Sequence, residues 1–291
     1  MRLPQHLIET FSGFVEQQQP VALVTVVSTS GSTYSKTGSQ MLVGADGSVH
    51  GLLSGGCLEN DLAERAANAI ETGQTDRVEY DLRGDDDVFG LGVGCEGAMQ
   101  IEIRPLLAAD NYEPFSGWLT AIEKDGYADT SFARLEKPYA VLILGAGYDA
   151  EPLVGFCHAL GWRTSVSDHR PGYVGRMQQQ HKGDIRCVPV GELASKVDLD
   201  RFDAAIVMSH HLASDRQYLS TLADSPIEFV GLLGPPHRRD RLLEEIGEAR
   251  QKLTGRLRSP VGKRLGGRGP SAIALEVAAE LQEYFCELKS D

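Results

Sequence analysis

Two cysteines in the first hundred residues stand on glycine-rich segments, where a reactive thiol is easily presented. Cys57 ends the run Ser54-Gly55-Gly56-Cys57 directly before an amphipathic segment, and Cys95 ends a second run, Gly-Val-Gly-Cys. A thiol at a helix start has its thiolate stabilised by the helix dipole, which makes it a better nucleophile and a better soft-metal ligand. Adjacent glycines let a planar ligand or a phosphate approach the backbone. We therefore expect Cys57 to be a metal ligand, with the three preceding residues beside the bound group and Cys95 lining the same pocket.

An inert role remains open for both thiols, because free cysteine is often a small buried hydrophobe beside a tight turn. The other three cysteines, Cys157, Cys187 and Cys286, are expected to be structural. An odd number of cysteines without a secretion signal indicates reduced thiols rather than a disulfide framework.

The second half carries a glycine turn typical of dinucleotide-binding folds. Gly145-Ala146-Gly147 is followed by Tyr-Asp-Ala and lies between an apolar run and a helical pattern, which fits G-x-G-x-x-A. Asp168 ends the next strand-like run, where a carboxylate can bind a ribose hydroxyl and repel a 2′-phosphate. We therefore expect Gly145, Gly147 and Asp168 to bind NAD in preference to NADP. A Rossmann fold that has lost its nucleotide is the alternative, since Asp149 stands where a phosphate prefers neutral N–H groups.

Further polar residues follow later strands of the same half. His210 and His211 come after the fourth strand, where either one can contact a ligand or neither does. Arg238 and Arg239 follow another strand and are more simply explained as a solvated helix start. The sequence contains no evident nucleophile with a base and an orienting group, no metal-ligand cluster and no P-loop, so no catalytic residue is assigned and a non-catalytic protein is favoured.

The elements that must position these residues fall into two halves. Apolar and glycine patterns predict a mixed α/β domain first and then alternating strands and helices, which indicate a Rossmann-type, doubly wound parallel sheet. A segment between them has one helical pattern and no strong strand pattern. The predicted parts are an N-terminal domain over 1–107 with a first helix at 7–18, a connecting segment over 108–137 with a helix at 115–124, and a Rossmann-type domain over 138–291 with a last helix at 270–287.

Charge and hydropathy exclude several classes of protein. The chain of 291 residues has a net charge of −13, which opposes binding to nucleic acid. No apolar run approaches the roughly 20 residues of a membrane span, and the first residues lack the pattern of a signal peptide. We therefore expect a cytoplasmic protein that binds neither nucleic acid nor membrane.

Several segments together resemble the XdhC/CoxI family of maturation factors for molybdenum hydroxylases. They span both halves in order, and the coincidence of the two cysteine loops with a C-terminal glycine turn is specific. The segments are GSTYSKTGSQMLVGADGSVHGLLSGGCLE, FGLGVGCEGAMQIEI, LILGAGYDAEPL, MSHHLASDRQYL, FVGLLGPPHRRDRLL and SPVGKRLGGRGPSAIALEVAAEL.

This resemblance implies a chaperone that binds molybdenum cofactor, a molybdopterin, assists its sulfuration and inserts it into a xanthine dehydrogenase-type enzyme. Thiolate chemistry suits a molybdenum–sulfur centre. The implied partner is that client enzyme, with a cysteine desulfurase and a second copy of the chain as further candidates. An NAD(P)-dependent oxidoreductase and a pure docking module with a vestigial nucleotide fold are the alternatives.

Overall fold

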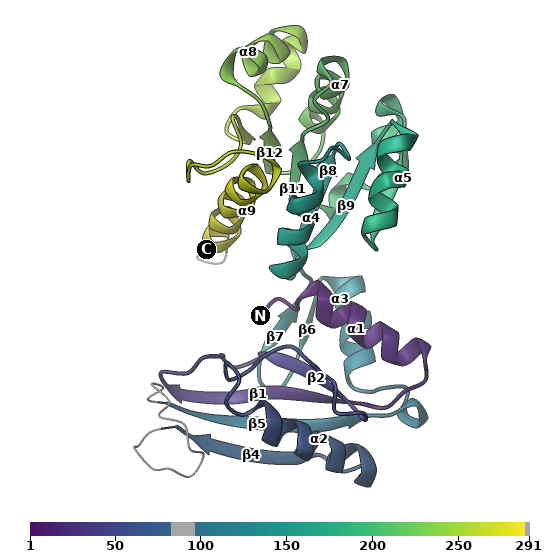
Figure 1. Ribbon diagram of the computed structural model, residues 1–291, viewed down its shortest axis with the longest axis vertical. Helices are drawn as coiled ribbons and strands as arrows, with labels where there is room; N and C mark the ends of the chain where they lie inside the picture. The colour runs from purple at the N-terminus through teal and green to yellow at the C-terminus, as the bar shows by residue number, and fades with distance from the viewer. Residues whose placement is uncertain (83–96, 289–291) are drawn as a thin grey trace. The chain divides into compact units, whose positions relative to one another are not determined.

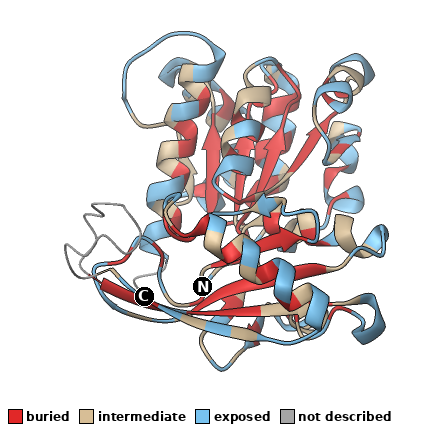
Figure 2. Ribbon diagram, turned by 60° about the horizontal axis from the view of Figure 1, so that its bottom comes forward, coloured by how far each residue is buried: buried red, intermediate tan, exposed pale blue. Residues whose placement is uncertain are grey.

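The computed structural model describes residues 1–82 and 97–288 and divides the chain into two compact units, Met1–Pro138 and Tyr139–Asp291. In both units, buried strands are covered by helices whose outer faces are exposed (Figure 2). Within the described residues, no helix combines the length and the apolar character that a membrane span requires.

The N-terminal unit is built on a five-stranded antiparallel sheet. Its strands are β1 (Val21–Gly31), β2 (Gln40–Gly44), β3 (Val49–His50), β4 (Asp76–Asp81) and β5 (Gly97–Leu106). They lie in the order β3-β2-β1-β5-β4 (Figure 1). The long strands β1 and β5 form the centre of the sheet, and their pairing shifts between Val26 and Ser28.

Helices cover the two faces of this sheet. Helix α2 (Glu59–Thr72) packs its Leu62 and Ala66 with strand residues on one face. Helices α1 (Gln5–Glu16) and α3 (Phe115–Asp125) form an apolar cluster on the other face. Helices therefore cover part of each face of the sheet, while alternate residues of β4 and Gln100 of β5 are exposed.

Residues 108–137, predicted as a connecting segment, contain α3 and a hairpin of β6 (Tyr127–Asp129) and β7 (Arg134–Glu136). The helix lies close to its predicted bounds. The hairpin strands have only three residues each, too few for a period of two to stand out in the sequence.

The C-terminal unit confirms the predicted Rossmann-type fold. Its strands are β8 (Ala140–Leu144), β9 (Arg163–Asp168), β10 (Asp184–Cys187), β11 (Ala204–Val207), β12 (Phe229–Leu232) and β13 (Leu257–Arg258). All six are parallel and follow the order β10-β9-β8-β11-β12-β13, which is the Rossmann order 3-2-1-4-5-6 when the strands are numbered along this unit.

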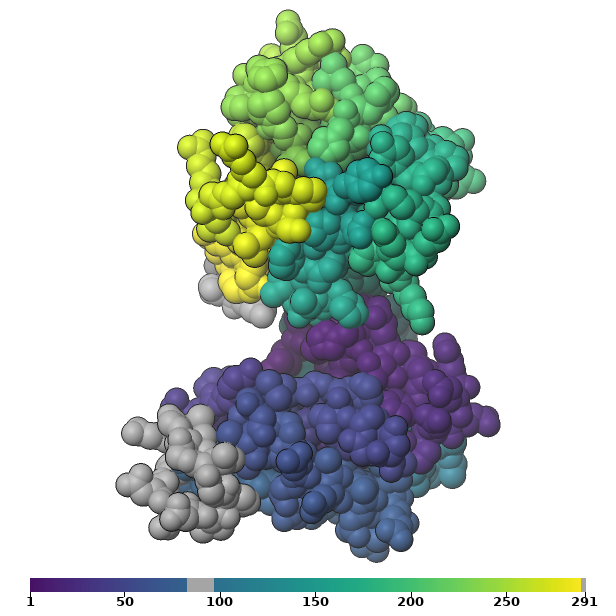
Figure 3. Space-filling view, in the orientation of Figure 1, coloured from purple at the N-terminus to yellow at the C-terminus, as the bar shows by residue number. Residues whose placement is uncertain are grey.

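Helices lie on both faces of the parallel sheet. They are α4 (Ala150–Ala159), α5 (Pro171–Gln180), α6 (Leu193–Lys196), α7 (Leu212–Ala223), α8 (Pro236–Glu245) and α9 (Pro270–Glu287), with short 3₁₀ turns at Val190–Glu192, Leu199–Arg201 and Gly247–Leu253. A further 3₁₀ turn, Ala108–Asp110, lies in the N-terminal unit. Helix α9 packs beside α4 at the surface (Figure 3), and the rings of Tyr139 and Phe285 stack with centroids 4.0 Å apart beneath it. Helices α7 and α8 contribute to the apolar cluster on the opposite face.

Candidate functional site

The loop that carries Cys57 makes a sharp turn before α2. Gly55 and Gly56 have φ angles of +78° and +109°, which non-glycine residues rarely adopt. Cys57 is half-buried and directly precedes Leu58, the N-cap of α2. The thiol therefore lies beside the start of a helix on a strongly bent segment.

Glu59, the first residue of α2, holds this loop together. Its Oε1 accepts hydrogen bonds from the N–H groups of Leu53 (3.0 Å) and Ser54 (2.8 Å). Its Oε2 accepts from the Ser54 hydroxyl (2.5 Å) and from the N–H groups of Gly56 (3.0 Å) and Leu58 (3.2 Å). One internal carboxylate thus binds five donors of the loop.

These hydrogen bonds also control the charge of Glu59. Burial alone would raise the pKa of its carboxyl, but the hydrogen bonds from Ser54 and Leu53 outweigh burial and lower the pKa below its ordinary value of 4.5. The carboxylate is therefore ionised at neutral pH. The loop donors at Ser54 and Gly56, predicted to face a ligand, are used inside the protein.

Cys95 lies outside the described residues, so the predicted pocket shared with Cys57 remains a prediction. Among the residues that the structure does describe, no group of three or more His, Cys, Asp or Glu side chains is arranged to hold a metal ion.

The glycine turn of the C-terminal unit connects β8 to α4. Gly145 has φ +128°, and a Cβ there would lie 2.6 Å from the carbonyl oxygen of Met208, so only glycine fits. Gly147 lies beside the Asp149 carboxylate, 3.1 Å from the position of a Cβ. The predicted strand–turn–helix geometry is present at the carboxyl edge of the sheet.

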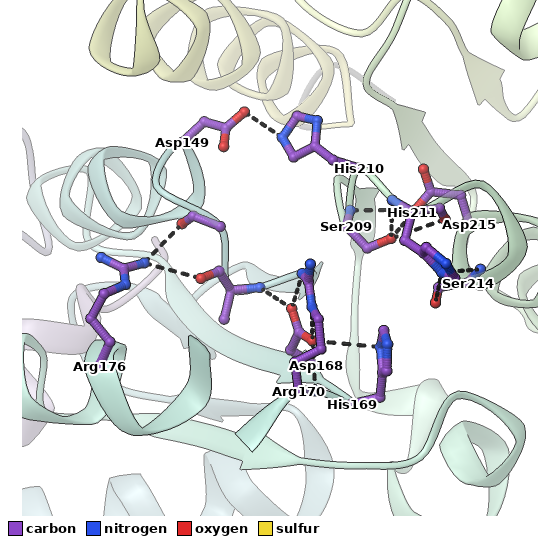
Figure 4. Close-up of polar contacts among 12 residues, drawn as sticks. Asp149, Asp168, His169, Arg170, Arg176, Ser209, His210, His211, Ser214 and Asp215 are labelled. Atoms are coloured by element: carbon purple, nitrogen blue, oxygen red, sulfur yellow. Dashed lines mark hydrogen bonds and ion pairs between the residues drawn. The ribbon is translucent and has the colours of Figure 1, made fainter. Parts of the chain in front are cut away.

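Asp168 ends β9 and supports this turn. Its carboxylate is fully buried and accepts hydrogen bonds from Ala146 N–H (2.8 Å) and from the backbone and guanidinium of Arg170 (2.6–2.9 Å), as Figure 4 shows. Burial acts to raise the pKa of Asp168. The hydrogen bonds and the charge of Arg170 outweigh burial, so the pKa lies below its ordinary value. The carboxylate predicted to bind a ribose is thus fully engaged with protein donors.

A second arginine fixes the carbonyl side of the turn. Arg176 donates to the carbonyl oxygens of Ala146 (3.0 Å) and Gly147 (3.3 Å) and pairs with Glu151 (2.7 Å). Its guanidinium also lies over the exposed ring of Tyr148, 4.2 Å from the ring centroid. The turn is therefore held through both its N–H and its carbonyl groups.

A third contact spans the mouth of the turn. Asp149 Oδ2 lies 2.7 Å from His210 Nε2, and the two side chains point toward each other (Figure 4). The hydrogen bond that His210 donates to Asp149 raises the pKa of His210. Burial acts to raise the pKa of Asp149, but the hydrogen bond and charge of His210 outweigh it and lower that pKa. His210 has φ +58°, a left-handed conformation uncommon for non-glycine residues. His210 therefore contacts the α4 N-cap residue.

His211 has a different role from its neighbour. It is the N-cap of α7, and its Nδ1 accepts from Ser214 N–H at 3.3 Å. Beside it, Asp215 binds the Ser209 hydroxyl (2.5 Å) and Arg238 (2.6 Å). Arg238 therefore pairs with a buried acid of the same edge, while Arg239 pairs with the exposed Asp240.

Sequence reasoning missed Glu59, Arg170 and Arg176 as functional candidates. A carboxylate placed in the first turn after a Ser-Gly-Gly run is a signal for Glu59, since such an acid can reach the loop N–H groups. The two arginines carry no sequence signal of that kind, because their targets are backbone atoms and a carboxylate brought together by the sheet.

Comparisons with known proteins agree with this architecture. A family model described as "XdhC and CoxI family" matches residues 14–81, and one described as "XdhC Rossmann domain" matches residues 141–281. The crystal structure of a xanthine dehydrogenase from Bacillus halodurans has a similar fold, with a TM-score of 0.78 at 24% identity over 96% of both chains.

Two curated relatives are similar over most of their length. A probable xanthine dehydrogenase subunit of Bacillus subtilis (strain 168) is 26% identical over 92% of this chain and 94% of its own length. The molybdenum cofactor insertion chaperone PaoD of Escherichia coli (strain K12) is 24% identical over 89% of this chain and 81% of its own length.

Proposed function

The chain belongs to the XdhC and CoxI family, and we propose that it binds molybdenum cofactor as cargo, assists its sulfuration and inserts it into a xanthine dehydrogenase-type molybdenum hydroxylase. The similarity to an insertion chaperone for this cofactor supports the cargo. The client is a molybdenum hydroxylase, and a cysteine desulfurase and a second copy of the chain are further proposed partners.

The observation that carries the proposal is the position of the Cys57 thiol on the loop fixed by Glu59. A half-buried thiol on a rigid turn can bind a soft metal centre without a costly rearrangement of the loop. The five donors bound by Glu59 do not include the N–H groups of Gly55 and Cys57. We propose that Ser54 and Gly56 shape the loop, while Gly55 and Cys57 face the cargo, with Cys95 as a second thiol.

The test is cofactor retention by Cys57→Ser. The full chain is incubated with molybdenum cofactor, separated by gel filtration and analysed for molybdenum per chain. We expect Cys57→Ser to lose at least about tenfold in retention, because a hydroxyl is a poor ligand for a soft metal. Cys286→Ser, at an exposed position on α9, is the matched control. Retention by Cys57→Ser at the level of this control would remove the thiol from the site.

A second candidate function is nucleotide binding at the glycine turn of the C-terminal unit. The steric requirement for Gly145 and the Rossmann strand order favour it. We propose NAD as the ligand, with the pyrophosphate over Gly145 and Gly147. Asp168 must then exchange part of its contact with Arg170 for a ribose hydroxyl.

Titration calorimetry with NAD and with NADP tests this second candidate. Tighter binding of NADP would reverse the proposed preference, and no binding of either would favour a fold without nucleotide. Oxidation of a substrate by the chain alone with NAD, at about 1 per second or faster, would favour the oxidoreductase alternative over a cofactor carrier.

A further inference from the structure

The N-terminal unit contains a cavity of about 200 Å³ that none of the contacts described above involves. Three segments line it: the first residues up to His6, residues 38–40 at the start of β2, and residues 51–52 after β3. Its volume exceeds the roughly 150 Å³ of an engineered cavity that holds benzene, so a small ring system fits. The wall formed by Gly51 and Leu52 continues along the chain into the loop that carries Cys57.

A buried amide at the start of β2 forms part of this cavity. Gln40 is only 9% exposed, and its Oε1 has no hydrogen-bond partner, while its Nε2 lies 3.4 Å from Thr25 Oγ1. Buried polar atoms in native proteins are nearly always hydrogen-bonded, so an unpartnered one beside a cavity marks a position for a ligand's polar group. The amide carbonyl requires a donor, such as a ring N–H or an amino group.

The charge around the cavity favours an acidic group on the same ligand. Its described lining includes the cation Arg2 and no Asp or Glu, although the protein carries a net charge of −13. Arg2 donates to the carbonyl oxygen of Lys137 and lies 3.6 Å from Glu136, so its charge is partly offset. Helix α1 begins among the residues that line the cavity, and its N-cap, Pro4, offers no side-chain hydrogen bond to the first N–H groups of the helix.

Apolar side chains complete the wall. Leu3 is buried beneath the cavity, and Leu52 lies exposed at its rim. The Leu52 side chain can contact the face of a planar ring while Gln40 binds its edge. The combination selects a flat heterocycle with an N–H donor edge and an acidic substituent.

We infer that this cavity binds the pterin ring of the cargo, with the donor edge of the ring on Gln40 and its acidic substituent toward Arg2. The inference rests on the proposed function, because a pterin combines these chemical features with the proposed cargo. The ring is thereby assigned to residues of the N-terminal unit that precede the Ser54–Cys57 loop and are not part of it.

The test uses two fluorescent probes, pterin and pterin-6-carboxylate, titrated into the full chain purified without cofactor. We expect both to saturate, with the carboxylate binding about tenfold more tightly because of Arg2. Gln40→Met should weaken both compounds about tenfold, and Arg2→Gln should remove only the advantage of the carboxylate. Gln100→Met, an exposed glutamine on β5 of the same sheet, is the control and should bind as the unaltered chain does.

The inference is overturned if neither compound saturates the folded chain, or if folded Gln40→Met binds both as tightly as the control. Should Gln40→Met fail to fold, Leu52→Trp at the exposed rim must instead weaken both compounds, and unchanged binding by that variant overturns the inference. Molybdenum retention separates the two proposals. If Gln40→Met retains molybdenum as the unaltered chain does, the assignment of the ring to this cavity is wrong but the proposed function stands. If the chain binds pterin but does not retain the molybdenum cofactor, the proposed function is wrong.

Discussion

Replacing Glu59 by glutamine tests whether one carboxylate determines the shape of the Cys57 loop. The substitution preserves size but leaves one acceptor oxygen and adds an NH₂ group that faces former donors. With the amide oxygen in place of Oε2, the N–H groups of Leu53 and Ser54 lose their acceptor. With it in place of Oε1, the Ser54 hydroxyl and the Gly56 N–H lose theirs, while Leu58 N–H keeps Ser54 Oγ at 2.7 Å. At about 1–3 kcal/mol for each unsatisfied buried donor, we expect a loss of about 2–4 kcal/mol of unfolding free energy, after some relaxation toward water.

Because each structural unit contains one tryptophan, the loss of unfolding free energy can be followed in the N-terminal unit by itself. Trp118 lies on α3 in the N-terminal unit and Trp162 in the C-terminal unit. In a Trp162→Phe background, urea unfolding followed by fluorescence reports on the N-terminal unit alone. Glu64→Gln, an exposed position on α2, is the matched control. The rate of Cys57 alkylation should rise in Glu59→Gln, because the loop opens more often.

The contribution of Glu59 to the unfolding free energy depends on pH in a defined direction. Because the pKa of Glu59 is lower in the folded protein than its ordinary 4.5, its contribution to stability is present above pH 4.5 and is lost as the pH falls through the lowered value. The stability difference between the Trp162→Phe background and Glu59→Gln should therefore shrink in acid. A stability within about 0.5 kcal/mol of the Glu64→Gln control at pH 7 would refute the reasoning.

Three further predictions concern the C-terminal unit, where unfolding can be followed by Trp162 fluorescence in a Trp118→Phe background. Gly145→Ala should cost at least about 2 kcal/mol, because of the steric overlap and the left-handed φ, and an unchanged midpoint would contradict this. Arg170→Ala should cost about 3–5 kcal/mol, because it leaves the buried Asp168 carboxylate without its arginine; a loss below about 1 kcal/mol would show that the pair is not needed. Asp149→Asn should lower the pKa of His210 in an NMR titration, since the raised pKa depends on that carboxylate. The contribution of the raised His210 pKa to stability is present below its unfolded pKa and is lost as the pH rises through the raised value. A titration midpoint of His210 unaffected by the substitution would rule out the contact.

Local patterns of residue types were sufficient to predict the class of fold and the position of the glycine turn. Alternating apolar runs and helical patterns arise from local periodicity, and the turn at Gly145 combines a strand, two glycines and a helix within a short stretch. The last helix, at 270–287, was also predicted with the bounds that the structure has. The hairpin at 127–136 was not, since its strands are too short to show a pattern.

Which groups remain available to a ligand depends instead on the three-dimensional arrangement of the chain. Asp168 has the residue type and spacing for a ribose contact, yet Arg170 and the Ala146 N–H occupy its carboxylate. Asp149 and His210 are 61 positions apart and meet because β8 and β11 are neighbours in the sheet. Hydrogen bonds and burial depend on distances between segments remote in sequence, and no local pattern of residue types encodes those distances.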